Sequence, residues 1–381
     1  MMQDEIMTAT EKFQKLLKKQ LERAEYLKKN SSVVDFKKSD KIIIGICGGD
    51  GIGPIISKQA KRVLEHILRD EIAAKRIEIR EISGLTIENR VKCQQAIPSD
   101  VLDELKECDV ILKGPTTTPR SGDEWTNVES ANVAMRKELD LFANVRPVKI
   151  PSEDIDWTFF RENTEGGYAL GSDGINVSPE LAIDFTIATT EGTRRIIRSA
   201  FDYAKVNGKH KVTAVTKANI IKTTDGKFLD IFYQIASEYP EINADDWYID
   251  IMTAKLLDKN RRKEFSVLVL PNLYGDIITD EAAELQGGVG TAGSANIGAR
   301  YAMFEAIHGS APRMIEENRE MYADPSSMIK AAAMLLSHIG YAEGAKSIET
   351  ALEKIDIKIT GRDDGVTNEE FTSQLIGMLD V

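Results

Sequence analysis

The fold class is decided by Lys41-Ile-Ile-Ile-Gly-Ile-Cys-Gly-Gly-Asp-Gly-Ile-Gly-Pro54. Its first half is a short apolar run rich in β-branched residues, which is typical of a strand buried inside a sheet. The glycines that follow indicate a turn, and apolar residues then recur at helical spacing, at Ile56, Ala60, Val63, Leu64 and Leu68. Strand, glycine turn and helix together make a βα unit.

The same signal returns further along the chain. Apolar runs at Val110–Lys113, Val212–Val215 and Phe265–Leu270 each lead into loop residues. Alternating strand and helix signals favour an α/β architecture in which helices cover the faces of a sheet. The segment Leu170–Ile187 differs, because glycines and a Ser-Pro step interrupt its β-branched residues. It predicts an antiparallel two-stranded arm, which would suit a clasp between subunits.

Composition excludes several classes of function. The chain has 381 residues and a net charge of −12, so a nucleic-acid backbone would not be attracted to it overall. No apolar run approaches the ~20 residues of a membrane-spanning helix. The three cysteines (Cys47, Cys93 and Cys108) lack the spacing of a zinc site or a disulfide framework. We therefore expect a cytoplasmic protein with reduced thiols.

The N-terminus carries a separate signal. Residues 4–29 have apolar positions at three- and four-residue steps, which predicts an amphipathic helix. A mitochondrial presequence would be poor in acids, whereas this segment carries Asp4, Glu5, Glu11 and Glu22 among its acidic residues. We expect a helical extension packed on the body of the protein or on a partner subunit.

The glycine segment is easily over-interpreted. Gly48–Pro54 does not match the G-x-G-x-x-G fingerprint, and proline stands where that fingerprint continues into its helix. A purely structural turn is at least as good an interpretation as a phosphate-binding loop.

Basic residues form a more informative group. Asn132 and Arg136 lie four residues apart in the helical segment after Ser130, and Arg146 and Arg161 follow. The planar fork of arginine suits bidentate carboxylate binding, so converging arginines predict a polycarboxylate substrate. For any one of these arginines, a surface salt bridge is the simpler alternative.

Acidic residues form a second group of candidate site residues, beside the basic ones. Asp276 and Asp280 lie one helical turn apart after the strand ending at Leu270. Paired carboxylates suit Mg²⁺ or Mn²⁺, although helix capping would explain one of them. Lys217 ends another strand and Asp250 interrupts an apolar run. Taken alone, each of these two is more often a solvated strand end than a catalytic residue.

Taken in their order along the chain, these segments resemble the isocitrate/isopropylmalate dehydrogenase family. The resemblance extends from about Lys41 to Leu379. The resemblance implies an α/β fold that is not a Rossmann fold. It also implies a large cofactor-binding domain made of residues 41–141 and 287–381. A small domain, 142–286, would carry a dimer clasp at about 165–200, and residues 1–40 would form the N-terminal helical extension.

The resemblance also implies roles for individual residues. Tyr168 and Lys217 would be catalytic, with Tyr168 as the general acid and Lys217 contributed by the partner of a homodimer with shared active sites. Asp276 and Asp280 would bind Mg²⁺ or Mn²⁺ together with the partner's copy of Asp250. The substrate would be bound by Ser130, Asn132, Arg136, Arg146, Arg161 and Asn219.

The resemblance implies that the cofactor binds at residues 116–118, at residues 305–313 and at Asp324. The residues concerned are Thr116, Thr117, Thr118, Glu305, His308, Gly309, Ser310, Ala311, Arg313 and Asp324. NADP is favoured over NAD, because Arg313 stands where NAD-using members place an aspartate that binds the ribose hydroxyls. Two features weigh against an NADP preference. Asp324 stands where many members have asparagine, and Arg313 could instead pair with Glu316 or Glu317.

Substrate choice depends on Ser130 and Asn132. Isocitrate enzymes of the family carry Ser-x-Asn there, whereas isopropylmalate enzymes have Glu and Leu. We therefore expect oxidative decarboxylation of isocitrate to 2-oxoglutarate. The alternatives are the same chemistry on homoisocitrate, 3-isopropylmalate, tartrate or malate, or a regulatory subunit without activity. The segment Arg120–Glu129 is longer than in many relatives and could reshape the substrate pocket.

Overall fold

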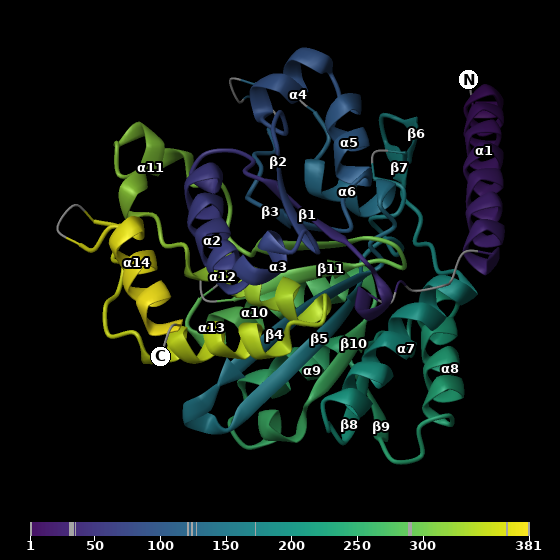
Figure 1. Cartoon of the computed structure of the whole chain (residues 1–381). Helices are drawn as coiled ribbons and strands as arrows, with labels where there is room; N and C mark the ends of the chain where they lie inside the picture. The colour runs from purple at the N-terminus through teal and green to yellow at the C-terminus, as the bar shows by residue number, and fades with distance from the viewer. Residues whose placement is uncertain are drawn as a thin grey trace. The chain divides into compact units, whose positions relative to one another are not determined.

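The chain forms two compact units in a computed structural model (Figure 1). The middle unit contains residues 1–32 and 142–286, and the flanking unit contains residues 33–141 and 287–381. The structure describes residues 2–29, 34, 36–119, 122, 125–126, 128–171, 173–288, 292–362 and 365–379. The chain therefore leaves the flanking unit after Leu141 and returns to it after Gln286.

The flanking unit is built on a mostly parallel sheet. The predicted strand β1 (Ile42–Cys47) pairs in parallel with β2 (Ile77–Ile82) and with β3 (Val110–Lys113). Beyond β3 lies β12 (Ala302–Ala306), again parallel, and β11 (Gly293–Ile297) is antiparallel to it. The helices of this unit are α2 (Gly53–Ile67), α3 (Arg69–Ala73), α4 (Ile87–Cys93), α5 (Ser99–Lys106), α6 (Ala131–Glu138), α11 (Pro312–Glu316), α12 (Ser326–His338), α13 (Ala342–Lys354) and α14 (Asn368–Leu379), with single 3₁₀ turns at Phe36–Lys38 and Glu320–Tyr322.

The middle unit has its own five strands. β4 (Ala143–Ile150) and β5 (Ile155–Glu162) form an antiparallel pair, after which β10 (Val267–Leu270), β8 (Lys211–Thr216) and β9 (Asn243–Tyr248) continue in parallel with β5. Its helices are α7 (Thr190–Val206), α8 (Thr224–Ala236), α9 (Ile249–Leu257) and α10 (Asn272–Gln286), with 3₁₀ turns at Pro151–Glu153 and Arg261–Glu264. The carboxyl ends of four parallel strands therefore share one edge, where α/β folds place their sites.

Burial explains why these segments are strands. β10 is apolar throughout and every residue of it is buried, as expected for a strand covered on both faces. Its core also contains the fully buried Trp157 and Phe159 of β5, which meet edge to face at 6.2 Å between ring centroids. This packing fixes the end of β5, after which the loop 163–168 begins.

The N-terminal extension is one long helix, α1 (Met2–Lys29), in purple in Figure 1. It packs on α7 and on β6 (Ile175–Ser178), the first strand of a small hairpin completed by β7 (Leu181–Ile183). Leu16 of α1 is buried with Leu170 and Ile175. The predicted helix and the predicted two-stranded arm are thus both present, and they contact each other. Among the described residues, no helix is long and apolar enough to cross a membrane.

Candidate active site

The glycine turn of the flanking unit joins two loops. Gly49 has a φ of +73°, and a Cβ there would lie 2.2 Å from the carbonyl oxygen of Pro115. Gly51 has a φ of +57°, and its Cβ would lie 2.0 Å from the carbonyl oxygen of Ser310. Only glycine permits both the left-handed backbone and this approach. The structure thus gives the turn a structural role.

Hydrogen bonds complete this junction. The carboxylate of Asp50 accepts from the backbone N–H groups of Thr117 and Ile87, both at 2.7 Å. The hydroxyls of Thr117 and Ser310 lie 2.9 Å apart. Burial raises the pKa of Asp50, and the two N–H donors oppose that rise. The two loops expected to bind the cofactor, at 116–118 and 308–312, are therefore held together.

Three predicted substrate residues lie on α6 or at its start. Ser130 is the N-cap residue, but its side chain makes no capping hydrogen bond. Asn132 accepts a hydrogen bond from the hydroxyl of Thr116 at 3.2 Å, which leaves its amide N–H groups as donors. Arg136 contacts Glu305 at 3.5 Å. The helix thus connects the predicted substrate residues to predicted cofactor residues.

Arg90 holds this region and was not expected from the sequence. Its side chain is fully buried and donates to the carbonyl oxygens of Thr117 and Glu129, both at 2.7 Å. Burial lowers the pKa of Arg90, while the nearby Asp50 opposes that shift. Arg90 lies in a short segment with no apolar periodicity to mark it as buried, so the sequence offered no signal. Half of the Arg120–Glu129 segment lies outside the described residues, and its effect on the pocket stays a prediction.

The remaining predicted cofactor residues lie at the surface of the flanking unit. Nδ1 of His308 is 3.0 Å from the carbonyl oxygen of Gly309, and Ala311 adopts a left-handed φ of 45°. The side chain of Arg313 is 84% exposed and pairs with Glu317 at 2.7 Å, the alternative considered for it. Asp324 lies two residues before the start of α12 and accepts from the backbone N–H of Ser326, the first residue of that helix, at 2.8 Å.

Four side chains of the middle unit, three of them predicted site residues, come together. Arg161 is buried at the end of β5, and both Nε and Nη2 donate to the Asn272 side-chain oxygen, at 3.0 and 2.7 Å. Its Nη1 pairs with Asp276, and the hydroxyl of Tyr168 donates to the other oxygen of that carboxylate at 2.9 Å. Asn272, which was not predicted as a site residue, is the common support of this cluster.

Two of the three predicted metal ligands, Asp276 and Asp280, lie one turn apart on α10. Arg146 of β4 pairs with Asp280 at 2.7 Å and also donates to the hydroxyl of Thr279 at 2.8 Å. The carboxylates of Asp276 and Asp280 are 36% and 61% exposed, so an ion could reach both. Their hard oxygens fit Mg²⁺ or Mn²⁺. Within the described parts of one chain, no group of three or more His, Cys, Asp or Glu side chains could hold a metal.

Lys217 and Asp250 form a separate pair. Lys217 follows β8, Asp250 lies in the first turn of α9 after β9, and their charged groups are 2.5 Å apart. Neither has a described hydrogen bond to Tyr168 or Asp276. Asn219 is exposed in the turn that follows Lys217.

Residues 43–377 match the family model described as isocitrate/isopropylmalate dehydrogenase. The chain belongs to the isocitrate/isopropylmalate dehydrogenase family. The matched segment includes every predicted site residue, and α1 lies outside it.

Relatives in this family carry several names. The chain is 41% identical to the NADP isocitrate dehydrogenase of Rickettsia prowazekii over 82% of this chain and 62% of that protein. It is 39% identical to the 3-isopropylmalate dehydrogenase of Methanothermobacter thermautotrophicus (82% and 89%), and 38% identical to the homoisocitrate dehydrogenase of Methanocaldococcus jannaschii (80% and 87%). The chain thus spans less than two thirds of the Rickettsia prowazekii relative, and names alone do not select one substrate.

A solved structure supports the same fold. The isocitrate dehydrogenase of Methylococcus capsulatus is similar with a TM-score of 0.77 and 35% identity, covering 89% of this chain and 100% of that one.

The chain is also 34% identical to a subunit of the NAD isocitrate dehydrogenase of Schizosaccharomyces pombe over 81% of this chain and 79% of that one. The family therefore uses a nicotinamide cofactor, and its members divide between NAD and NADP.

Proposed function

We propose that this chain catalyses the oxidative decarboxylation of isocitrate to 2-oxoglutarate, with reduction of NADP and a requirement for Mg²⁺ or Mn²⁺. The observation that carries the choice of substrate is the start of α6. There Ser130 keeps its hydroxyl out of the helix cap and Asn132 keeps its amide N–H donors. Two neutral donors suit the extra carboxylate of isocitrate and offer nothing to an isopropyl group.

The arginines supply the charge that a tricarboxylate needs. Arg161 is held rigidly by Asn272, and buried Nε atoms of Arg136 and Arg146 have no hydrogen-bond partner among the described residues. Arg136 contacts the carboxylate of Glu305 at 3.5 Å, and Arg146 contacts that of Asp280 at 2.7 Å as well as the hydroxyl of Thr279 at 2.8 Å. We infer that substrate carboxylates compete for these guanidinium groups.

Proton transfers fall to Lys217 and Tyr168. Lys217 removes the proton from the substrate hydroxyl, and Tyr168 delivers a proton to the carbon that has lost CO₂. Asp250, Asp276 and Asp280 would hold the divalent ion, which when bound would supply Lewis-acid polarisation of the substrate oxygen. A bound nicotinamide would supply the hydride acceptor.

The NADP preference rests on Arg313. Its ion pair with Glu317 is highly exposed, and such ion pairs contribute little to stability, so a 2′-phosphate can displace the carboxylate. The phosphate would accept charge-assisted hydrogen bonds from the guanidinium group. We further propose a cytoplasmic homodimer in which Lys217 and Asp250 of one subunit complete the Tyr168 site of the other.

The test is the formation of reduced cofactor at 340 nm. Isocitrate, homoisocitrate, 3-isopropylmalate, malate and tartrate would each be tried with NADP and NAD, with and without Mn²⁺. We expect the highest kcat/KM for isocitrate with NADP, and no turnover after chelation. A preference for any other acid, or full activity of chelator-treated protein, would overturn the proposal.

A further inference from the structure

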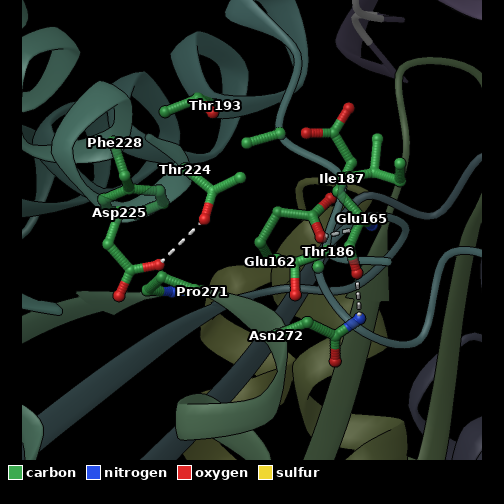
Figure 2. A pocket seen from close by; sticks show the side chains of 12 residues that line it. Glu162, Glu165, Thr186, Ile187, Thr193, Thr224, Asp225, Phe228, Pro271 and Asn272 are labelled. Carbon is green, nitrogen blue, oxygen red and sulfur yellow. Dashed lines mark hydrogen bonds between the residues drawn. The ribbon is translucent and has the colours of Figure 1, made fainter. Parts of the chain in front are cut away.

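The helix α1 contacts a buried acidic pair beside the Tyr168 cluster. Glu162 and Glu165 lie at the end of β5 and in the loop after it, and 3% or less of either residue is exposed. Both line a small cavity of about 30 Å³, together with Asn272 and Asp225 (Figure 2). A space of this size holds a water molecule but no metabolite. The pair is therefore part of the support of the site.

The two carboxylates organise the loop 163–168 from within. Glu162 accepts from the backbone N–H of Thr164 at 3.0 Å and of Glu165 at 2.5 Å. Glu165 accepts from the backbone N–H and the hydroxyl of Thr189, at the start of α7. A Cβ on Gly192 would lie 2.2 Å from Oε1 of Glu165, so that carboxylate has no room to shift towards α7.

Two neighbouring buried carboxylates need compensating positive charge. Burial, followed by the charge of Glu165, raises the pKa of Glu162 to about 7. Compensation for Glu165 comes from α1, where Nη1 of Arg23 lies 2.8 Å from the carboxylate and Nη2 donates to the hydroxyl of Thr164 at 3.0 Å. Arg195 of α7 also donates to that hydroxyl, at 3.1 Å, so guanidinium groups from α1 and from α7 meet at Thr164.

The loop transmits this contact to the proposed site. The side-chain amide of Asn272 donates to the backbone oxygen of Glu165 at 3.0 Å, as Figure 2 shows. The same Asn272 holds Arg161, and Arg161 and Tyr168 both contact Asp276. A shift of Glu165 therefore moves the support of Arg161 and one end of the segment that carries Tyr168.

We propose that Arg23 is a positioning residue: by clamping Glu165 and Thr164, α1 holds the loop 163–168 in the geometry that the Arg161–Tyr168 cluster needs. The inference rests on the proposed function for its consequence in catalysis. It gives a role to a helix that lies outside the segment matched to the family, residues 43–377.

The first experiment replaces Arg23 by methionine, which keeps the length of the side chain and removes its charge. The matched control is Lys19→Met, because Lys19 is on the same helix but forms only an exposed pair with Asp173 at 3.7 Å. We expect kcat/KM for isocitrate to fall by about 10- to 100-fold in Arg23→Met, since a displacement near 1 Å has an effect of this order. The Kd for NADPH should not change, because its proposed contacts are in the flanking unit. Lys19→Met should behave as wild type.

A second variant separates charge compensation from simple attachment of the helix. Glu165→Gln keeps the shape and an acceptor oxygen but removes the charge that Arg23 neutralises. Combined with Arg23→Met, it should recover most of the lost kcat/KM, and Arg23→Lys should retain part of it. If Arg23→Met does not fold, the double variant Arg23→Met/Glu165→Gln, in which no carboxylate is left uncompensated, should fold and keep most of the wild-type kcat/KM. An absence of recovery in the double variant would overturn the proposal.

Hydrogen–deuterium exchange provides a readout that is independent of turnover. Exchange in residues 163–168 and 187–192 should be faster in Arg23→Met than in Lys19→Met, with the flanking unit unchanged. Unchanged exchange in these segments would refute the positioning role. If the wild-type protein does not oxidise isocitrate but Arg23→Met still exchanges faster than Lys19→Met, the proposed function is wrong and the role of Arg23 in the loop stands.

Discussion

Gly275 is a glycine inside helix α10 that the geometry of Arg161 requires. A Cβ at this position would lie 2.5 Å from Cγ and 2.6 Å from Cβ of Arg161. Carbon atoms in contact prefer about 3.5–4.0 Å, so Gly275→Ala must displace Arg161 by roughly 1 Å. These are the stem atoms of a side chain fixed at its far end by Asn272 and Asp276, so rotation of the guanidinium cannot absorb the clash.

The expected effect on activity is larger than the effect on stability. Alanine improves the helix by about 1 kcal/mol over glycine, while overpacking costs ~1–3 kcal/mol. The net loss in the free energy of unfolding should therefore not exceed about 2 kcal/mol. Displacement of Arg161 by roughly 1 Å should lower kcat/KM about 100-fold, equivalent to ~2.7 kcal/mol of transition-state stabilisation.

The assay compares kcat/KM for isocitrate with urea unfolding of the same samples. Gly377→Ala in α14 is the control, because a Cβ there meets no atom within 4 Å. It should leave activity unchanged. If Gly275→Ala retains wild-type kcat/KM while remaining folded, the argument that Arg161 must occupy its observed position is wrong.

Three further predictions concern substrate, assembly and cofactor. Ser130→Glu should abolish isocitrate turnover, because it places a carboxylate against the substrate's own, and full activity in that variant would remove the basis of the substrate assignment. Mixing inactive Lys217→Met with inactive Tyr168→Phe should restore part of the activity if each site uses both subunits; no recovery in verified heterodimers would place both residues within one chain. Arg313→Asp should lower the ratio of kcat/KM for NADP over NAD by roughly 10- to 150-fold, and an unchanged ratio would show that Arg313 does not contact the 2′-phosphate.

Local patterns were enough to predict the elements whose environment is uniform. Within the run at 41–47, the strand β1 is buried apart from one partly exposed residue. Its apolar composition therefore indicates a buried strand. In contrast, β9 contains Asn243-Ala-Asp-Asp-Trp-Tyr248, a polar segment with no strand signal. It is a strand because β8 supplies a complete parallel ladder to pair with. An edge strand needs few apolar residues, so its composition carried no information.

The sequence alone determined the α/β class, the amphipathic N-terminal helix, the two-stranded arm, and which arginines, aspartates, tyrosine and lysine could carry chemistry. Those features depend on neighbours in the chain, or on an ordered set of motifs that can be read along it. Tertiary structure decided which of these side chains meet. Arg23 and Glu165 are 142 positions apart, and Asn272 reaches Arg161 across 111 positions. Contacts at these separations are made by packing of α1 on α7 and of α10 on β5, and no local periodicity encodes them.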